Sequence, residues 1–153
     1  MTRGFTIIEL LVVIGIGVII LSTTSVLLLS GQRKVTKISF QEQMLSDIKS
    51  VQINAMTGQN GGGAKGVYFG EDSYTLFSGT SHDSQDPGNF VIDIGQSIQL
   101  ETTFPGSVIV FLGISGEIAN YNSNFNTLTI VDKTDNSSQV ISFNKYGVAV
   151  SQN

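Results

Sequence analysis

The sequence predicts an α+β protein with a long N-terminal helix, its first half transmembrane, and a C-terminal head of antiparallel β-sheet or sandwich packed on the second half. Three observations indicate this fold. Residues 5–29 are almost wholly apolar, an apolar stripe at helical spacing continues to about residue 57, and short β-branched segments separated by turn residues fill 64–153. A helix followed by many short strands is typical of α+β folds.

Length, charge and cysteine usage exclude several function classes. The 153 residues suffice for one domain with an appended element. Eight Lys and Arg against twelve Asp and Glu give a net charge of −4, which offers nucleic acid no basic surface. The sequence has no cysteine, and this excludes a disulfide framework, a thiolate metal site and a cysteine nucleophile.

The N-terminal apolar run predicts a membrane helix. At about 1.5 Å per residue, residues 5–29 would cross a hydrocarbon core of about 30 Å. A cleaved secretory signal is the alternative, but its apolar part is usually about 7–15 residues long and ends in a small-x-small site, whereas here the run is longer and no Ala-x-Ala follows it. Arg3 precedes the run, whereas Arg33, Lys34 and Lys37 follow it, so charge alone leaves the orientation open.

Glu9 is the one charged residue inside the apolar run. A carboxylate within a membrane span costs about 2.5–3.5 kcal/mol, and such residues usually have a partner. Glu9 therefore either stays hydrated near the start of the span or pairs with a cation.

Residues 4–13 read GFTIIELLVV. This segment resembles the class III signal of type IV pilins and type II secretion pseudopilins. The resemblance implies that residues 1–4 are a leader which a prepilin peptidase removes by cutting after Gly4, and that the new amino terminus at Phe5 is methylated. It implies that Glu9 pairs with the Phe5 amine of a neighbouring subunit during assembly.

The resemblance also implies an organisation and a location. Residues 5–30 would form the transmembrane and filament-core helix, and residues 31–153 the soluble head. The chain would cross the bacterial inner membrane once, with a cytoplasmic N-terminus and an extracytoplasmic head, before entering a filament. The implied partners are the peptidase, other pilin or pseudopilin subunits, the inner-membrane assembly platform and membrane lipid. No cofactor is implied.

A stripe of apolar residues predicts the second half of the helix and its buried face. It comprises Phe40, Met44, Ile48, Val51 and Ala55, with Leu45 beside it. The residues Asp47, Lys49 and Gln52 fall off the stripe, and the helix is expected to end near Gly58.

The remaining residues predict a β-rich head. The first two strands, Val67–Phe69 and Tyr74–Phe77, form a hairpin, and seven more follow. The later strands are Phe90–Ile94, Ser97–Glu101, Val108–Leu112, Glu117–Tyr121, Leu128–Val131, Val140–Phe143 and, as the last, Val148–Val150. This order resembles the pseudopilin H and FimT group of minor pilins, on whose pattern Ala55, Gly58, Ile141, Phe143, Gly147 and Val150 can be laid.

Other motifs predict no chemistry. Gly61, Gly63 and Gly66 spell G-x-G-x-x-G, but they follow a helix and precede a strand, the reverse of a dinucleotide site. His82, with Asp83 and Asp86, is better explained by a polar loop than by a metal site. No catalytic constellation is present, so an enzyme is not expected.

An enzyme is not expected, and two other function classes remain open. The first hypothesis is a structural subunit, a minor pilin or pseudopilin of a type IV pilus-like or type II secretion filament. The alternative is a binding module whose head captures DNA, a surface or a secreted protein. Some FimT-type proteins bind DNA through a basic C-terminal tail, but here Lys145 is the only cation near the end, so nucleic acid is not the expected partner.

Overall fold

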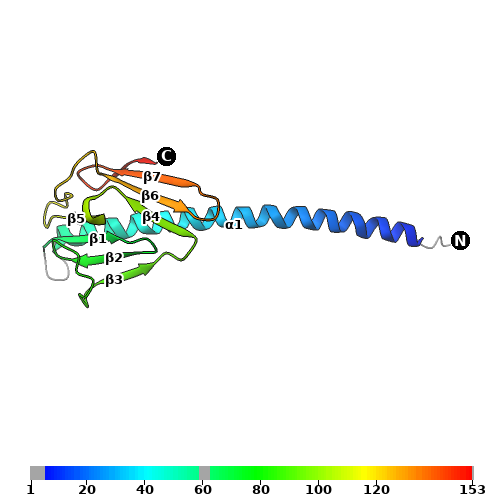
Figure 1. Ribbon diagram of the computed structural model, residues 1–153, viewed down its shortest axis with the longest axis horizontal. Helices are drawn as coiled ribbons and strands as arrows, with labels where there is room; N and C mark the ends of the chain where they lie inside the picture. Colours follow the sequence, from blue (N-terminus) through cyan, green and yellow to red (C-terminus); the bar gives the residue numbers. More distant parts are fainter. Residues whose placement is uncertain (1–5, 59–62, 153) are drawn as a thin grey trace. The chain divides into compact units, whose positions relative to one another are not determined.

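The computed structural model describes residues 6–58 and 63–152, and side chains at 6–19, 38–58 and 63–150. The chain divides into two compact units, Met1–Ser39 and Phe40–Asn153. Each is described by itself below, and Figure 1 shows the elements of both.

Helix α1 spans Ile7–Thr57. Thr6 precedes its first turn and caps it, since the backbone N–H of Glu9 donates to Thr6 Oγ1 at 3.3 Å. Thr6 and Glu9 have the T-x-x-E spacing of a capping box, in which a side-chain oxygen satisfies an N–H that the helix leaves unpaired. At the other end Gly58 has a φ of +70°, the left-handed conformation with which glycine commonly ends a helix. The prediction of a helix end near Gly58 is confirmed.

The expected transmembrane segment is corrected. Among the described residues, no helix is both long enough and apolar enough to cross a membrane. The apolar side chains that the structure describes in α1 run from Ile7 to Ile19. The single-pass location in a bacterial inner membrane is corrected with it.

The predicted fold class is corrected in its transmembrane first half, and its antiparallel β part consists of two separate four-stranded sheets. The first has the order β3-β2-β1-β5 and the second the order β4-β6-β7-β8. A short 3-10 helix, η1, covers Pro105–Ser107. The strands are β1 (Lys65–Phe69), β2 (Ser73–Ser78), β3 (Phe90–Asp93), β4 (Ile98–Thr102), β5 (Val108–Phe111), β6 (Thr127–Asp132), β7 (Ser138–Phe143) and β8 (Ala149–Gln152).

Most predicted strands coincide with observed ones, and one does not. The hairpin of β1 and β2 is confirmed, with Val67 opposite Leu76 and Phe69 opposite Tyr74. The expected strand Glu117–Tyr121 is wrong, since this segment forms only an isolated bridge between Phe111 and Ile118. The segment runs along β5 over too few residues to form a ladder of hydrogen bonds, although apolar and polar residues alternate in it as they do in a strand.

The core of the Phe40–Asn153 unit lies between the two sheets and residues 40–57 of α1, as Figure 1 shows from the course of the ribbon. The predicted stripe is confirmed: Met44, Ile48, Val51 and Ala55 are at most 5% exposed, and Phe40 and Leu45 pack against the cluster. Both sheets contribute side chains that are wholly buried. These are Val67, Tyr74, Ile109 and Phe111 from the first sheet, and Leu128, Ile130 and Ile141 from the second.

Tyr74 carries a polar atom into this core. Its side chain is 0% exposed, and its hydroxyl donates to Asp47 Oδ2 at 2.5 Å. Burial, and then the hydrogen bond and charge of Asp47, raise the pKa of Tyr74 above its ordinary value of 10.0.

This shift predicts a loss of stability at alkaline pH. Because the pKa of Tyr74 is raised in the folded state, the stability that its protonated hydroxyl contributes to the fold is complete below pH 10.0. This contribution declines as the pH rises above that value. We expect the free energy of unfolding to fall above pH 10.0 in the native chain and to fall less steeply in Tyr74→Phe, measured by chemical denaturation at several pH values. Tyr146→Phe, whose ring is 60% exposed, is the matched control and should keep the native slope. Equal slopes for the native chain and Tyr74→Phe would contradict this role.

Ile114 has an unusual backbone. Its φ is +71° and its side chain is 89% exposed, so little burial offsets the strain. A β-branched residue in the left-handed region is an outlier, with a cost of about 1–2 kcal/mol.

We therefore expect Ile114→Asn to raise the free energy of unfolding by about 1 kcal/mol, because asparagine tolerates this conformation. Ile114→Val keeps the branched side chain and should leave stability unchanged. Denaturant titration of both variants measures the difference, and a loss of stability in Ile114→Asn would show that the side chain makes a contact which outweighs the strain.

Candidate functional site

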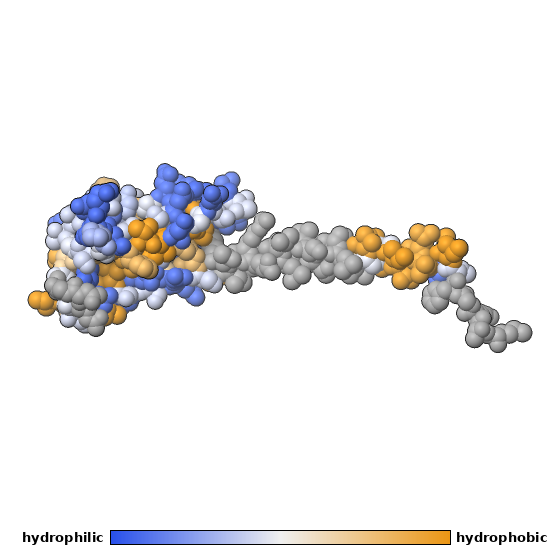
Figure 2. Space-filling model, turned by 90° about the horizontal axis from the view of Figure 1, so that it is seen from below, coloured by the Kyte–Doolittle hydropathy of each residue, from blue (hydrophilic) through white to orange (hydrophobic). Residues whose placement is uncertain are grey.

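The N-terminal part of α1 presents an apolar surface on all sides. Ten large aliphatic side chains between residues 7 and 19 are each 54–81% exposed. Figure 2 shows this segment in the colour of hydrophobic residues. They are Ile7, Ile8, Leu10, Leu11, Val12, Val13, Ile14, Ile16, Val18 and Ile19. A helix that is hydrophobic all round is normally buried, so this surface needs a partner.

Two glycines interrupt the aliphatic surface. A Cβ placed at Gly15 or at Gly17 would have no atom within 4 Å. Because glycine lacks a side chain, another backbone can approach α1 closely at these positions.

Glu9 lies in the first turn of α1 and is exposed. Its backbone N–H is held by Thr6, and among the described residues its carboxylate has no hydrogen-bond or ion-pair partner. A negative charge in the first turn interacts favourably with the positive end of the helix dipole. The T-x-x-E spacing is a local signal for this capping role, which the sequence analysis missed.

The predicted processing residues, Gly4 and Phe5, lie outside the described residues. The pairing of Glu9 with the Phe5 amine of a neighbour therefore stays a prediction.

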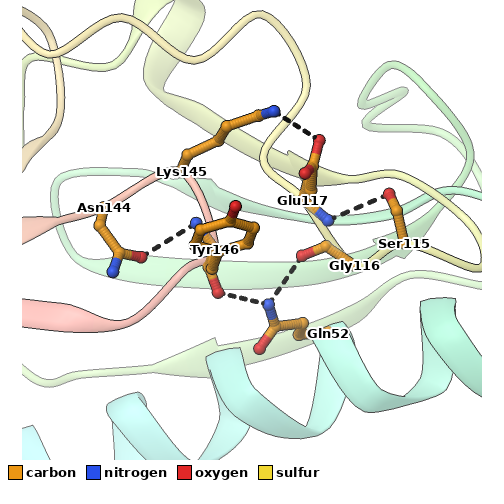
Figure 3. Close-up of polar contacts among 7 residues, drawn as sticks. All are labelled: Gln52, Ser115, Gly116, Glu117, Asn144, Lys145 and Tyr146. Carbon is orange, nitrogen blue, oxygen red and sulfur yellow. Dashed lines mark hydrogen bonds and ion pairs between the residues drawn. The ribbon is translucent and has the colours of Figure 1, made fainter.

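In the second unit, a buried polar residue joins two distant loops to the helix. Gln52 is only 4% exposed, although its position off the apolar stripe predicted an exposed side chain. Its Nε2 donates to the carbonyl oxygens of Gly116, at 2.7 Å, and of Tyr146, at 2.6 Å (Figure 3). Its Oε1 accepts a hydrogen bond from Lys49 Nζ at 2.7 Å. The amide therefore has all the partners that its burial requires.

The same two loops are also joined to each other. Glu117 Oε2 and Lys145 Nζ lie 2.9 Å apart, and Asn144 Oδ1 accepts a hydrogen bond from the N–H group of Tyr146 (Figure 3). Asn144 Oδ1 also accepts a hydrogen bond from the N–H group of Val148. The hydrogen bond to Glu117, and then its charge, raise the pKa of Lys145. Because this pair faces solvent, it orients the loops rather than stabilising them strongly.

Glycine is required where the second loop crosses the helix. Gly147 has a φ of +66°, and a Cβ there would lie 2.6 Å from the Phe111 ring and 3.1 Å from Gln52 Nε2. The loop can therefore contact both residues only because position 147 has no side chain.

This arrangement predicts that Gln52 is essential to the stability of the second unit. Gln52→Ala would leave two carbonyl oxygens without their donor, and we expect a loss of about 2–3 kcal/mol in the free energy of unfolding. Gln52→Glu would place a carboxylate against the same oxygens and should become less stable as the pH rises through its titration. Denaturant titration at acidic and neutral pH measures both effects. Lys49→Ala, which removes only the exposed donor, is the control, and a Gln52→Ala variant no less stable than Lys49→Ala would refute the role.

His82 and its acidic neighbours do not converge. The imidazole stacks on the Tyr68 ring with centroids 4.3 Å apart. Asp83 and Asp86 each accept a backbone N–H of their own loop, from Gln85 at 3.0 Å and from Gly88 at 2.8 Å. Within the described part of the chain, no group of three His, Cys, Asp or Glu residues could hold a metal ion.

Comparison with known proteins finds no matching family model, no matching curated protein and no matching solved structure.

Proposed function

We propose that the chain is a structural subunit, a minor pilin or pseudopilin, of a type IV pilus-like or type II secretion filament. The observation that carries the proposal is the apolar surface of α1 between residues 7 and 19, exposed on every side. In a filament core, helices of neighbouring subunits would surround this segment and remove it from water.

The energy available from such packing is large. Complete burial of an aliphatic side chain contributes about 1.5–3 kcal/mol, so ten half-exposed side chains offer on the order of 10 kcal/mol. Association costs about 4–15 kcal/mol in lost freedom of motion, and two or more neighbours per helix would offset it. The proposal assigns the surface to the helices of neighbouring subunits, because a helix that is apolar all round is normally buried.

Residues 4–13 support a specific route to assembly. Their resemblance to the class III signal suggests cleavage after Gly4 by a prepilin peptidase and methylation at Phe5. The cleavage creates an ammonium group at Phe5, and Glu9 offers a carboxylate without a partner among the described residues. Inside a dry helix bundle each charge would be costly alone, and a pair between neighbouring subunits would set their register.

Variants at two positions separate this pairing from the cap that Thr6 provides to the Glu9 N–H. Glu9→Gln keeps a residue that suits the third position of a capping box but removes the charge. Thr6→Ala removes the cap but keeps the charge. We expect Glu9→Gln to reduce the amount of subunit in sheared filaments about tenfold or more, and Thr6→Ala to leave most of it, measured by quantitative immunoblotting.

The mass of the N-terminal peptide is measured on the same samples. A peptide that begins at Phe5 and carries one methyl group is expected for the native chain and for both variants. Normal incorporation of Glu9→Gln would refute the pairing, and a peptide that begins at Met1 or Thr2 would refute the processing.

A further inference from the structure

The second unit contains a cavity of about 650 Å³ on the face of the first sheet that points away from the core. Ile109 and Phe111 of β5 point into the core, so Val108 and Val110 line the opposite face. Tyr68 lies opposite Val108 in the ladder and also lines the cavity. The volume is within the range of about 300–1,000 Å³ that is usual for small-molecule sites.

Aromatic rings form one wall of the cavity in a fixed arrangement. His82 stacks on Tyr68 with an angle of 2° between the rings, and the centroids of its ring and the Phe77 ring lie 5.5 Å apart in an edge-to-face arrangement. Gly66 leaves room for the Phe77 ring, since a Cβ there would come within 2.4 Å of the ring. Phe125 also lines the cavity and is 49% exposed. These rings need little ordering when a ligand binds.

Polar groups with unused hydrogen-bonding capacity accompany the rings. Thr80, Ser81 and Asn120 line the cavity, and their side chains have no hydrogen-bond partner among the residues that the structure describes. Asn122 uses its Oδ1 to accept the N–H of Asn124 at 2.9 Å, which leaves its amide N–H groups as donors.

The lining excludes a charged ligand. No Asp, Glu, Lys or Arg is among its residues. A charged group taken from water into this cavity would find no carboxylate, ammonium or guanidinium group as its partner, which is costly.

The backbone of β5 is not open to an added peptide strand either. On the side of β5 away from β1, Ala119 N–H donates to Val110 O at 2.8 Å and Leu112 N–H donates to Glu117 O at 2.9 Å. Peptide recognition by strand addition needs such groups to be free. A purely apolar ligand that covered the exposed amide of Asn120 would leave it without a partner.

We infer that this cavity binds a short neutral oligosaccharide. A sugar ring has an apolar C–H face that can rest on an aromatic ring, and hydroxyl groups around its edge that both donate and accept hydrogen bonds. The cavity supplies aromatic rings through Tyr68, His82 and Phe125, and the amide and hydroxyl partners through Asn120, Asn122 and Thr80. The inference does not depend on the proposed filament, because every residue of the cavity belongs to the Phe40–Asn153 unit.

The test is saturation-transfer NMR and calorimetry on the full chain, kept in solution by a detergent without a sugar headgroup. The probes are maltose, cellobiose, lactose and N,N′-diacetylchitobiose. At least one should bind, with the strongest transfer to its C–H protons. Phe125→Ala and Asn120→Gly should each raise its Kd about tenfold, a loss of about 1.4 kcal/mol. Glycine at position 120 accommodates the φ of +52° found there.

Phe90→Ala is the matched control, since it also removes an exposed phenyl ring, 66% exposed, but one that does not line the cavity. Its affinity for the sugar should equal that of the native chain, and near-ultraviolet circular dichroism of each variant shows whether the fold is kept. The inference is overturned if none of the four sugars binds at millimolar concentration, if Phe90→Ala weakens binding as much as Phe125→Ala, or if glucuronic acid binds as tightly as the best neutral sugar.

Discussion

The apolar face of α1 between Met44 and Ala55 is the constraint on which the second unit depends. Each sheet has only four short strands, and its buried side needs a cover. The same helix residues serve both sheets, since Ile109 and Phe111 from one and Leu128 and Ile130 from the other belong to a single core cluster. Because this one helix face covers the buried side of both sheets, its loss would expose two apolar surfaces at once. The unit should therefore unfold cooperatively.

Polar residues of α1 that lie beside its apolar face hold the strands and loops of the second unit against the helix. Asp47 meets the buried hydroxyl of Tyr74, and Gln52 meets two carbonyl oxygens from separate loops. Loops carry backbone groups that must find partners wherever they are buried. A glutamine amide suits this task because it donates twice and accepts at the same time, whereas an apolar residue on the same flank would leave both carbonyl oxygens unpaired.

The two units present surfaces of different physical character. The described start of α1 is aliphatic on all sides and has no polar groups apart from Glu9 and its cap, which suits extensive, non-directional packing against other helices. The cavity of the second unit combines aromatic faces with amide and hydroxyl groups, which suits directional recognition of a small neutral molecule. Assembly and recognition can therefore reside in separate parts of the chain, and substitutions in one need not disturb the other.

The sequence by itself determined the features that depend on neighbours along the chain. Helical spacing identified the stripe from Phe40 to Ala55, glycine marked the end of α1, and alternation located the β1–β2 hairpin. The T-x-x-E cap is equally local, since it joins residues three positions apart. Periodicity could not show that Glu117–Tyr121 lacks a ladder, that eight strands divide between two sheets, or that Gln52 is buried. Apolar composition likewise did not make the described part of α1 a membrane span. Only the tertiary structure decided these points, because strand pairing, loop packing and the cavity join residues dozens of positions apart, whose contacts leave no periodic signal in the sequence.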